Sequence, residues 1–275
     1  MTTVDVSIII INYNTFALTC GCLESIVEKT IGLTYEIILV DNNSSERQPD
    51  RFLDLFPEII LIKSPTNVGF AKGCNLGIEV AKGTLILLLN SDTLLQNNAI
   101  MIAKEFLERH VKVAVVSSIL LFPDGRVQNN CQRFPSIKYT LFELLRLQKI
   151  FSKKRAGKIL FGSFFNYREI AYPDWVWGTF FMFRKELLKQ LAGEKLADNF
   201  FMYGEDMLWC MEFRLRGYSV AFLPEAKTIH HMGQSAGAKS LLMKKNLEVF
   251  MHKYYPRWQA TLIHWLNNTL ILTNG

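Results

Sequence analysis

Three polar residues, Asn90, Ser91 and Asp92, come directly after the short apolar run Leu85–Leu89. Such a run is typical of a strand that is buried on both faces, and open α/β sheets bind ligands where their parallel strands end. Asp92 could hold a divalent cation at that edge, and the cation could hold a diphosphate. On this stretch alone, a turn that caps the next helix is the commoner outcome, but the rest of the chain reverses that weighting.

Two further polar clusters follow strand-like runs in the same way. Val6–Ile11 is rich in β-branched residues and ends in Asn12–Thr15, and Glu36–Val40 ends in Asp41–Ser45. Right-handed crossovers would bring Asn12, Asp41 and Asp92 to one edge of a sheet. Acids and amides gathered there predict a site for a nucleotide whose diphosphate is bound through a metal ion.

The elements that must position these residues alternate between strands and helices. Further strands are predicted at Glu58–Ile62 and Val113–Val116. Helices are predicted at Asn98–Arg109 and directly after Asn14 or Thr15, one of which would cap its helix. Strands that alternate with helices at this spacing indicate βαβ units, and therefore an α/β fold with a mostly parallel central sheet flanked by helices.

A third predicted helix carries glycines at a regular spacing. Gly69, Gly73 and Gly77 are four residues apart, so in a helix they share one face. Because glycine lowers helix stability, this face predicts that another part of the structure approaches the backbone closely.

Two acids and a histidine are candidates for chemistry in the second half of the chain. Glu205 and Asp206 fall in the first turn of a helix that runs to Leu215. They could compensate the helix dipole, and one of them could act as a general base at the mouth of a site. His230 lies in a predicted loop, where a histidine is either structural or a metal ligand.

An aromatic run, Asp174–Arg184, is typical of one long strand. Trp175 and Trp177 lie two residues apart along it. One of them could stack on a sugar ring, although core packing is the commoner role for a tryptophan.

Composition limits the classes of protein that need to be considered. The 275 residues are 49% hydrophobic, which argues against disorder, and the net charge of +6 suits anionic partners. Five cysteines without a metal or redox spacing predict free thiols in a reducing cytoplasm. The first residues are not expected to form a signal peptide, and no apolar run reaches the length of a spanning helix. The basic residues are not interleaved with a nucleic-acid reader motif, so nucleic acid is not expected as a partner.

Two basic and apolar segments leave a membrane contact open. Residues 139–165 predict either an interfacial helix on an anionic bilayer or a core-packed helix with a solvated basic end. Residues 240–260 predict a basic helix, and the apolar segments that follow it could contact a membrane or a partner, or pack back onto the domain. The expected location is cytoplasmic, peripheral at the inner face of the plasma membrane.

Taken in order, the motifs resemble those of family 2 glycosyltransferases with the GT-A fold. The matching segments span residues 5–235 and include Arg133-Phe-Pro-Ser136, which is similar to the rhamnosyltransferase-like subgroup of bacterial surface polysaccharide assembly. They are Ser7–Asn14, Val40–Ser45, Asn67–Asn75, Leu88–Thr93, Trp177–Gly178, Gly204–Asp206 and His230–Ser235.

The resemblance implies a two-part glycosyltransferase domain and a role for each matching residue. Residues 1–120 would form the nucleotide-sugar-binding half, 121–235 the acceptor-binding half, and 236–275 a helical extension. Asp92 and His230 would bind Mg²⁺ or Mn²⁺, Asp206 would be the general base with Glu205 as second choice, and Trp177 and Gly178 would contact the acceptor. The nucleotide-sugar site would be formed by Asn12, Tyr13, Asn14, Asp41, Asn43, Asn67, Gly69, Phe70, Asn75, Asn90, Ser91 and Asp92.

Two departures from the pattern bear on the function. Asn90 replaces the first acid of the Asp-x-Asp motif, and Leu208 stands where the subgroup often has another acid. We expect an inverting transfer of a sugar, rhamnose as the best guess, from dTDP-rhamnose or a UDP-sugar to a saccharide or lipid-linked saccharide. The alternative is a non-catalytic, nucleotide-binding scaffold subunit. A sugar-nucleotide pyrophosphorylase is disfavoured, because Asn12–Thr15 is not a Gly-rich basic loop.

Overall fold

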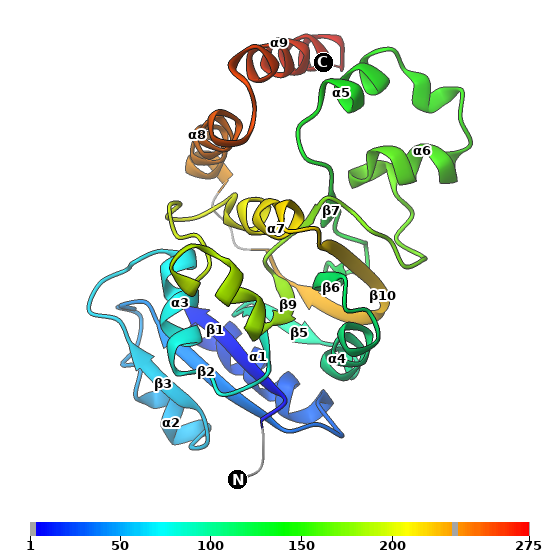
Figure 1. The fold of residues 1–275 in the computed structure, drawn as a ribbon. Helices are drawn as coiled ribbons and strands as arrows, with labels where there is room; N and C mark the ends of the chain where they lie inside the picture. Colours follow the sequence, from blue (N-terminus) through cyan, green and yellow to red (C-terminus); the bar gives the residue numbers. More distant parts are fainter. Residues whose placement is uncertain (1–3, 233–235, 275) are drawn as a thin grey trace.

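Within residues 4–232 and 236–274, which the computed structural model describes, eight strands form one central sheet in the order β3-β2-β1-β4-β9-β6-β10-β5 (Figure 1). Two further short strands, β7 and β8, pair separately. The strands are β1 (Val6–Asn12), β2 (Tyr35–Asp41), β3 (Ile60–Lys63), β4 (Leu85–Asn90), β5 (Thr93–Leu95), β6 (Val113–Leu121), β7 (Cys131–Gln132), β8 (Trp175–Val176), β9 (Phe180–Arg184) and β10 (Ser219–His230).

Helices cover both faces of this sheet. The α-helices are α1 (Phe16–Lys29), α2 (Arg51–Leu55), α3 (Phe70–Val80), α4 (Ala99–Arg109), α5 (Ile137–Leu144), α6 (Lys153–Leu160), α7 (Glu205–Leu215), α8 (Ala236–Tyr254) and α9 (Arg257–Asn274). Short 3₁₀ turns occupy Leu147–Lys149, Gly162–Phe164, Lys185–Gln190 and Ala192–Glu194.

The apolar strand β1 is buried on both faces, as its sequence predicts. Ile9 packs into a core that includes residues of α3 and α7, whereas Ile8 and Ile10 pack into a second core with α1 and α4. Each of the three side chains is at most 1% exposed. The alternation of side chains along a strand therefore explains why an uninterrupted apolar run was required here.

The glycine face of α3 packs against β1, which identifies the close approach predicted from the sequence. A Cβ atom on Gly73 would lie 3.3 Å from the side chain of Ile11, and one on Gly77 would lie 2.5 Å from Cγ2 of Ile9. Gly69 precedes the helix with φ +84° and leaves no room for a Cβ against the backbone oxygen of Phe201. The glycines therefore set the distance between α3 and the sheet.

Replacing Gly77 with Ala is expected to destabilise the protein by about 1–3 kcal/mol, because the buried Ile9 would have to move. The matched control is Gly21→Ala in α1, where a Cβ would lie 3.4 Å from Leu94. That change should be neutral or stabilise the helix by up to about 1 kcal/mol. Urea unfolding of both variants tests the prediction, and equal midpoints for the two would contradict it.

Strand β9 corrects the prediction of one long strand over Asp174–Arg184. The segment breaks after β8, and β9 then inserts antiparallel between β4 and β6. The break lies around Gly178, whose N–H donates to the carboxylate of Asp206 at 3.1 Å instead of to a strand. The side chain of Asp206 thus accepts a hydrogen bond from the N–H of Gly178, which in a continuous strand would pair with a neighbouring strand.

Strand β10 corrects the prediction that His230 lies in a loop. His230 is the last residue of this 12-residue strand and pairs antiparallel with Thr93 in β5, a strand that was not predicted. A three-residue strand that begins immediately after Asp92 carries no periodicity of its own, so only the partner strand reveals it.

The prediction that Asn14 or Thr15 caps α1 with its side chain is wrong. Thr15 occupies the cap position without accepting from a helix N–H. Its hydroxyl instead donates to Oδ1 of Asn12 at 3.0 Å, and Asn14 adopts a left-handed conformation with φ 54°. Hydrogen bonds within the edge cluster therefore replace the capping bond.

The second half of the chain forms separate short helices where longer ones were predicted. Residues 139–165 contain parts of α5 and α6, with Arg146 left-handed between them. The basic helix predicted at 240–260 ends before Pro256, and α9 begins after it. Pro cannot continue the hydrogen-bonding of a helix. The predicted boundary at residue 235, and the motif residues 233–235, lie outside the described residues.

Helices α5 and α9 lie side by side at the end of the molecule far from β3 (Figure 1). Thr140 of α5 donates to the side-chain oxygen of Asn267 in α9 at 3.1 Å, and Ala260, Ile263 and Leu266 are buried. One face of α9 thus packs back onto the domain. None of the helices within the described residues combines the length and the apolar character that crossing a bilayer requires.

Candidate active site

The carboxyl ends of β1, β2 and β4 bring the predicted polar residues together, as expected for parallel neighbours. In the sheet register Asn12 pairs with Asp41, and Ile11 pairs with Asn90. Next to this edge lies a cavity of about 690 Å³. It is lined by Tyr13, Phe70, Asn90, Asp92, Trp175, Trp177, Gly178, Thr179, Met202, Tyr203, Gly204, Glu205, Asp206, Met207, His230, Met232, Met243, Lys244 and Leu247.

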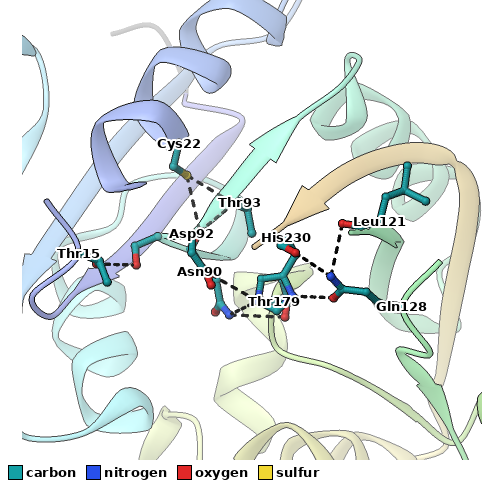
Figure 2. A network of polar contacts seen from close by, with 10 residues as sticks. Thr15, Cys22, Asn90, Asp92, Thr93, Leu121, Gln128, Thr179 and His230 are labelled. Atoms are coloured by element: carbon teal, nitrogen blue, oxygen red, sulfur yellow. Dashed lines mark hydrogen bonds and ion pairs between the residues drawn. The ribbon is translucent and has the colours of Figure 1, made fainter. Parts of the chain in front are cut away.

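Asp92 and His230 meet in this cavity. The amide of Asn90 lies beside them, although it is 140 residues from His230 in the chain. The distance from Nε2 of His230 to Oδ1 of Asp92 is 3.4 Å, and the distance from Nε2 to Nδ2 of Asn90 is 3.5 Å (Figure 2). The pairing of β5 with β10 holds the two residues together, and the N–H of His231 donates to the backbone oxygen of Asp92 at 2.9 Å.

The chemistry of these side chains fits a divalent cation bound together with a diphosphate. A carboxylate oxygen and an imidazole nitrogen are donors that Mg²⁺ or Mn²⁺ accepts, and such sites commonly complete their shell with phosphate and water. Within the described residues, no cluster of three or more His, Cys, Asp or Glu side chains is placed to hold a metal ion. The protein would therefore supply only part of the coordination shell.

The electrostatics around Asp92 favour its ionised form. Burial raises the pKa of this carboxyl, but when the His230 ring is protonated its hydrogen bond and its charge outweigh burial and hold the pKa below its usual range. A carboxylate that is ionised and partly desolvated is the form that can hold a cation.

Glu205 and Asp206 lie in the first turn of α7, as predicted. Both residues line the cavity. Asp206 accepts hydrogen bonds from the N–H groups of Gly178 at 3.1 Å and Met207 at 2.8 Å. Glu205 is buried, and its Oε2 atom has no hydrogen-bond partner. Because the Asp206 carboxylate accepts from the N–H groups of two other residues, whereas Oε2 of Glu205 has no partner, Asp206 ionises first.

Burial raises the pKa of both carboxyls. The pKa of Asp206 rises to about 6 through burial, although the two N–H donors oppose the change. The pKa of Glu205 rises to about 8 through burial and then through the charge of Asp206. Near neutral pH, Asp206 is therefore ionised beside a protonated Glu205, an arrangement suited to one general base.

Removing the acid at Glu205 is expected to stabilise the protein at high pH. The folded-state pKa lies above the unfolded value, so stability present at low pH is lost as the pH rises toward about 8. Glu205→Gln should therefore raise the free energy of unfolding by ~1–3 kcal/mol at pH 8 and leave it nearly unchanged at about pH 4.

Thermal unfolding at the two pH values measures this effect. Glu248→Gln on the exposed side of α8 is the control and should shift neither melting temperature. A Glu205→Gln protein that is no more stable than wild type at pH 8 would contradict the buried acid pair.

The predicted base-binding residues form a hydrogen-bonded cluster at the edge of the sheet. Nδ2 of Asn12 donates to Oδ1 of Asp41 at 2.7 Å, and the N–H of Ser44 donates to Oδ2 of Asp41 at 3.0 Å. Asn14 accepts from the N–H of Ser45 at 2.8 Å, and Asn43 is exposed with φ 64°. The cluster orders the loop after β2 beside β1.

Asn42, which the sequence did not single out, follows β2 and binds the loop before α3. Asn42 donates to Oδ1 of Asn67 at 2.9 Å and accepts from the N–H of Val68 at 3.0 Å, so it fixes the loop that leads to Gly69 and Phe70. Phe70 and Tyr13 line the cavity. Asn42 adjoins Asp41 in the predicted cluster, which is the signal that could have identified it.

Of the predicted nucleotide-sugar residues, Tyr13, Phe70, Asn90 and Asp92 line the cavity. The others do not, namely Asn12, Asn14, Asp41, Asn43, Asn67, Gly69, Asn75 and Ser91. The amide of Asn75 is bound on both sides by the backbone of Leu196, with Nδ2 to O at 2.9 Å and N to Oδ1 at 3.2 Å. It lies on the second turn of α3, beyond the edge cluster. The hydroxyl of Ser91 lies 3.1 Å from the hydroxyl of Thr15 and thus joins the end of β4 to the start of α1.

Trp177 and Gly178, the predicted acceptor contacts, line the cavity together with Trp175. Trp175 packs against one core and Trp177 against the other, although both line the cavity. Nε1 of Trp175 donates to the backbone oxygen of Arg133 at 3.0 Å. The wall near α8 is apolar, with Met202, Met243 and Leu247.

Leu208 is buried in the core behind α7 and does not line the cavity. Its side chain, 1% exposed, belongs to the same core as Trp209 and Phe181. The absence of an acid at this position therefore removes no charge from the cavity wall.

Comparison with known proteins places these features in a family. The chain matches glycosyl transferase family 2 over residues 7–192, more than half of its length. The glycosyltransferase GlyG of Streptococcus pneumoniae is 32% identical over 98 residues, covering 34% of this chain and 32% of that protein. The minor teichoic acid biosynthesis protein GgaB of Bacillus subtilis is 26% identical over 127 residues, covering 44% and 14%. The chain thus spans a third or less of these curated relatives.

Solved structures share the fold at low sequence identity. The mannosyltransferase PcManGT of Pyrobaculum calidifontis, in complex with GDP-Man and Mn²⁺, has a TM-score of 0.62 and 18% identity, covering all of this chain and 72% of that one. S. aureus TarS 1–349 in complex with UDP-GlcNAc has a TM-score of 0.63 and 15% identity, covering 89% and 65%. Together with the ordered sheet-edge motifs, the match over residues 7–192 shows that this chain belongs to glycosyl transferase family 2 and has the GT-A fold.

Proposed function

We propose that this protein is a metal-dependent, inverting glycosyltransferase that uses a nucleoside diphosphate sugar. The observation that carries the proposal is that the Asp92–His230 pair and Asp206 line the same cavity. The Asp92–His230 pair suits a cation that binds the leaving diphosphate. Asp206 suits proton transfer from an acceptor hydroxyl. PcManGT, described with GDP-Man and Mn²⁺, shares the fold and supports a divalent cation.

In this mechanism Asp92 and His230 would hold the cation, which when bound would supply positive charge to offset the charge that develops on the leaving nucleoside diphosphate. Asp206 accepts the proton of the acceptor hydroxyl while that oxygen bonds to the anomeric carbon and the carbon–phosphate-oxygen bond breaks. The N–H groups of Gly178 and Met207 orient the Asp206 carboxylate toward the cavity. A single displacement requires no nucleophilic side chain and inverts the anomeric configuration.

The donor is proposed to be dTDP-rhamnose or a UDP-sugar, and the product a cell-surface polysaccharide. The similarity of Arg133–Ser136 to the rhamnosyltransferase-like subgroup favours rhamnose. The relative GgaB, described as a minor teichoic acid biosynthesis protein, supports a role in cell-surface glycans. Asn12, Asp41 and Asn43 would border the nucleobase and ribose, and Asn67, Gly69 and Phe70 the nucleotide and diphosphate.

Donor hydrolysis by purified protein with Mg²⁺ or Mn²⁺ tests the proposal. Among dTDP-rhamnose, UDP-sugars and GDP-sugars, one class should release its nucleoside diphosphate in a metal-dependent way. Release from no donor, together with no metal-dependent nucleotide binding by calorimetry, would favour the alternative of a non-catalytic scaffold subunit.

A lipid-linked acceptor at the inner face of the plasma membrane completes the proposal. On α9, Trp258, Leu262 and Trp265 recur at helical spacing on the face opposite the buried one, and the tryptophans are 66% and 61% exposed. Exposed tryptophans with basic residues suit an anionic bilayer interface. The neighbouring segment supplies Lys138, Arg146, Lys149, Lys153, Lys154, Arg155 and Lys158.

Flotation with anionic vesicles is expected to recover the wild-type protein, and vesicles of zwitterionic lipid should recover much less. Replacing Trp258 and Trp265 with Ser should reduce recovery about tenfold or more, because both indoles leave the interface. Val111→Ser, at an exposed apolar residue before β6, is the control. Equal flotation of the two variants would contradict this surface.

A further inference from the structure

Gln128 is a buried side chain that binds His230 twice, and neither the motifs nor the proposed mechanism assigns it a role. It is 1% exposed and lies between β6 and β7. Nε2 of Gln128 donates to the backbone oxygen of His230 at 2.7 Å, and Oε1 lies 2.7 Å from Nδ1 of the same histidine (Figure 2). One amide therefore holds both the backbone and the ring of His230.

The surroundings of Gln128 determine which end of the amide faces the ring. Besides His230, its NH₂ group reaches the backbone oxygen of Leu121 at 3.4 Å. Both backbone oxygens can only accept hydrogen bonds, so the NH₂ group must face them. The opposite orientation would set the amide oxygen against two carbonyl oxygens in a buried place, which is costly. Oε1 must then face Nδ1.

The orientation of the amide in turn fixes the hydrogen on the ring. Oε1 can only accept, so Nδ1 of His230 must carry the hydrogen, and Nε2 is left with a lone pair. That lone pair faces Oδ1 of Asp92 at 3.4 Å. Two acceptors that face each other repel unless a positive ion joins them, so the neutral site presents two ligands to one cation.

We infer that Gln128 is a positioning residue that holds His230 in the Nδ1–H tautomer and so aims Nε2 and Asp92 at one divalent cation. The inference rests on the proposed function for the cation. It adds that the site is prepared before the metal arrives, by a residue that touches neither metal nor substrate. Outer hydrogen bonds of this kind commonly contribute 10- to 100-fold to metal affinity.

Nuclear magnetic resonance of the metal-free protein tests the inference without reference to activity. The long-range ¹H–¹⁵N spectrum of the neutral His230 ring should show the hydrogen on Nδ1 in wild type. In Gln128→Met, which is similar in volume and lacks the acceptor, the hydrogen should move to Nε2. Asn130→Leu is the matched control, because this buried amide binds Ser117 and Ser118 and makes no contact with His230. It should leave the tautomer unchanged.

Binding of Mn²⁺ in the presence of a nucleoside diphosphate is the second measurement. Gln128→Met is expected to raise the Kd for Mn²⁺ about 10- to 100-fold, with the control within about twofold of wild type. A wild-type ring with its hydrogen on Nε2 would overturn the inference without needing a variant to fold. So would a Gln128→Met ring that keeps Nδ1–H. An Nδ1–H ring in a wild-type protein that binds no Mn²⁺ would overturn the proposed metal site instead.

Discussion

Substituting Asp206 with Asn is expected to lower kcat/KM for sugar transfer by about 10²- to 10⁴-fold, the usual contribution of a positioned general base. The amide keeps the size of the side chain and still accepts from Gly178 or Met207, but it cannot take a proton from the acceptor. Steady-state kinetics with donor and acceptor measure the loss. Nucleotide binding should change little, because the proposed cation ligands are Asp92 and His230 and not Asp206.

Glu205→Gln decides which of the two acids is the base. Burial and the charge of Asp206 raise the pKa of Glu205 to about 8, so Glu205 is protonated when the base acts, and this variant should retain most of the activity and the same dependence on pH. In both wild type and Glu205→Gln, kcat/KM should rise with pH through about 6, where Asp206 ionises. Asp198→Asn, which changes a half-buried acid paired with Lys195, is the control. A larger loss in Glu205→Gln than in Asp206→Asn would reverse the two roles.

Substituting Asp92 with Ala is expected to abolish metal-dependent nucleotide binding and to lower kcat/KM by about 10²- to 10³-fold. A cation contributes several kcal/mol of charge stabilisation in the transition state, and each factor of ten in rate corresponds to about 1.36 kcal/mol. The loss follows because His230 alone cannot hold a hard cation against water. Calorimetric titration of UDP and dTDP, with and without Mn²⁺, measures the binding.

The control for Asp92→Ala is Asp124→Ala. Asp124 is an exposed acid that pairs with Arg126 in the turn after β6 and does not line the cavity. It should leave nucleotide binding unchanged. An Asp92→Ala protein that binds nucleotide with the same dependence on Mn²⁺ as wild type would contradict the metal site and return the edge residues to a structural role.

Several features of the site could be predicted from local sequence because local physics determines them. The run Leu85–Leu89 had to be a buried strand, so Asp92 had to lie at its end. The alternation of strands with helices implied parallel neighbours, and parallel neighbours place Asn12 and Asp41 at the same edge. Glu205 and Asp206 open a helix in both the prediction and the structure.

Other features depend on partners that are distant in the chain, and here the predictions were wrong or silent. The break at Gly178 follows from a hydrogen bond to Asp206, 28 residues later. Strand β5 exists because β10 pairs with it. Gln128 resembles any polar residue after a turn until β10 brings His230 beside it, 102 residues away in sequence.

From its sequence alone, this protein was determined to be an α/β glycosyltransferase of family 2, because periodicity and ordered motifs report the order of the elements and the chemistry at their ends. Only the tertiary structure decided how that chemistry is tuned. Burial raises the pKa of Asp206, and a buried amide orients His230 toward Asp92. Both effects depend on distance and solvent exclusion between segments that no local pattern relates, so they arise only when the chain has folded.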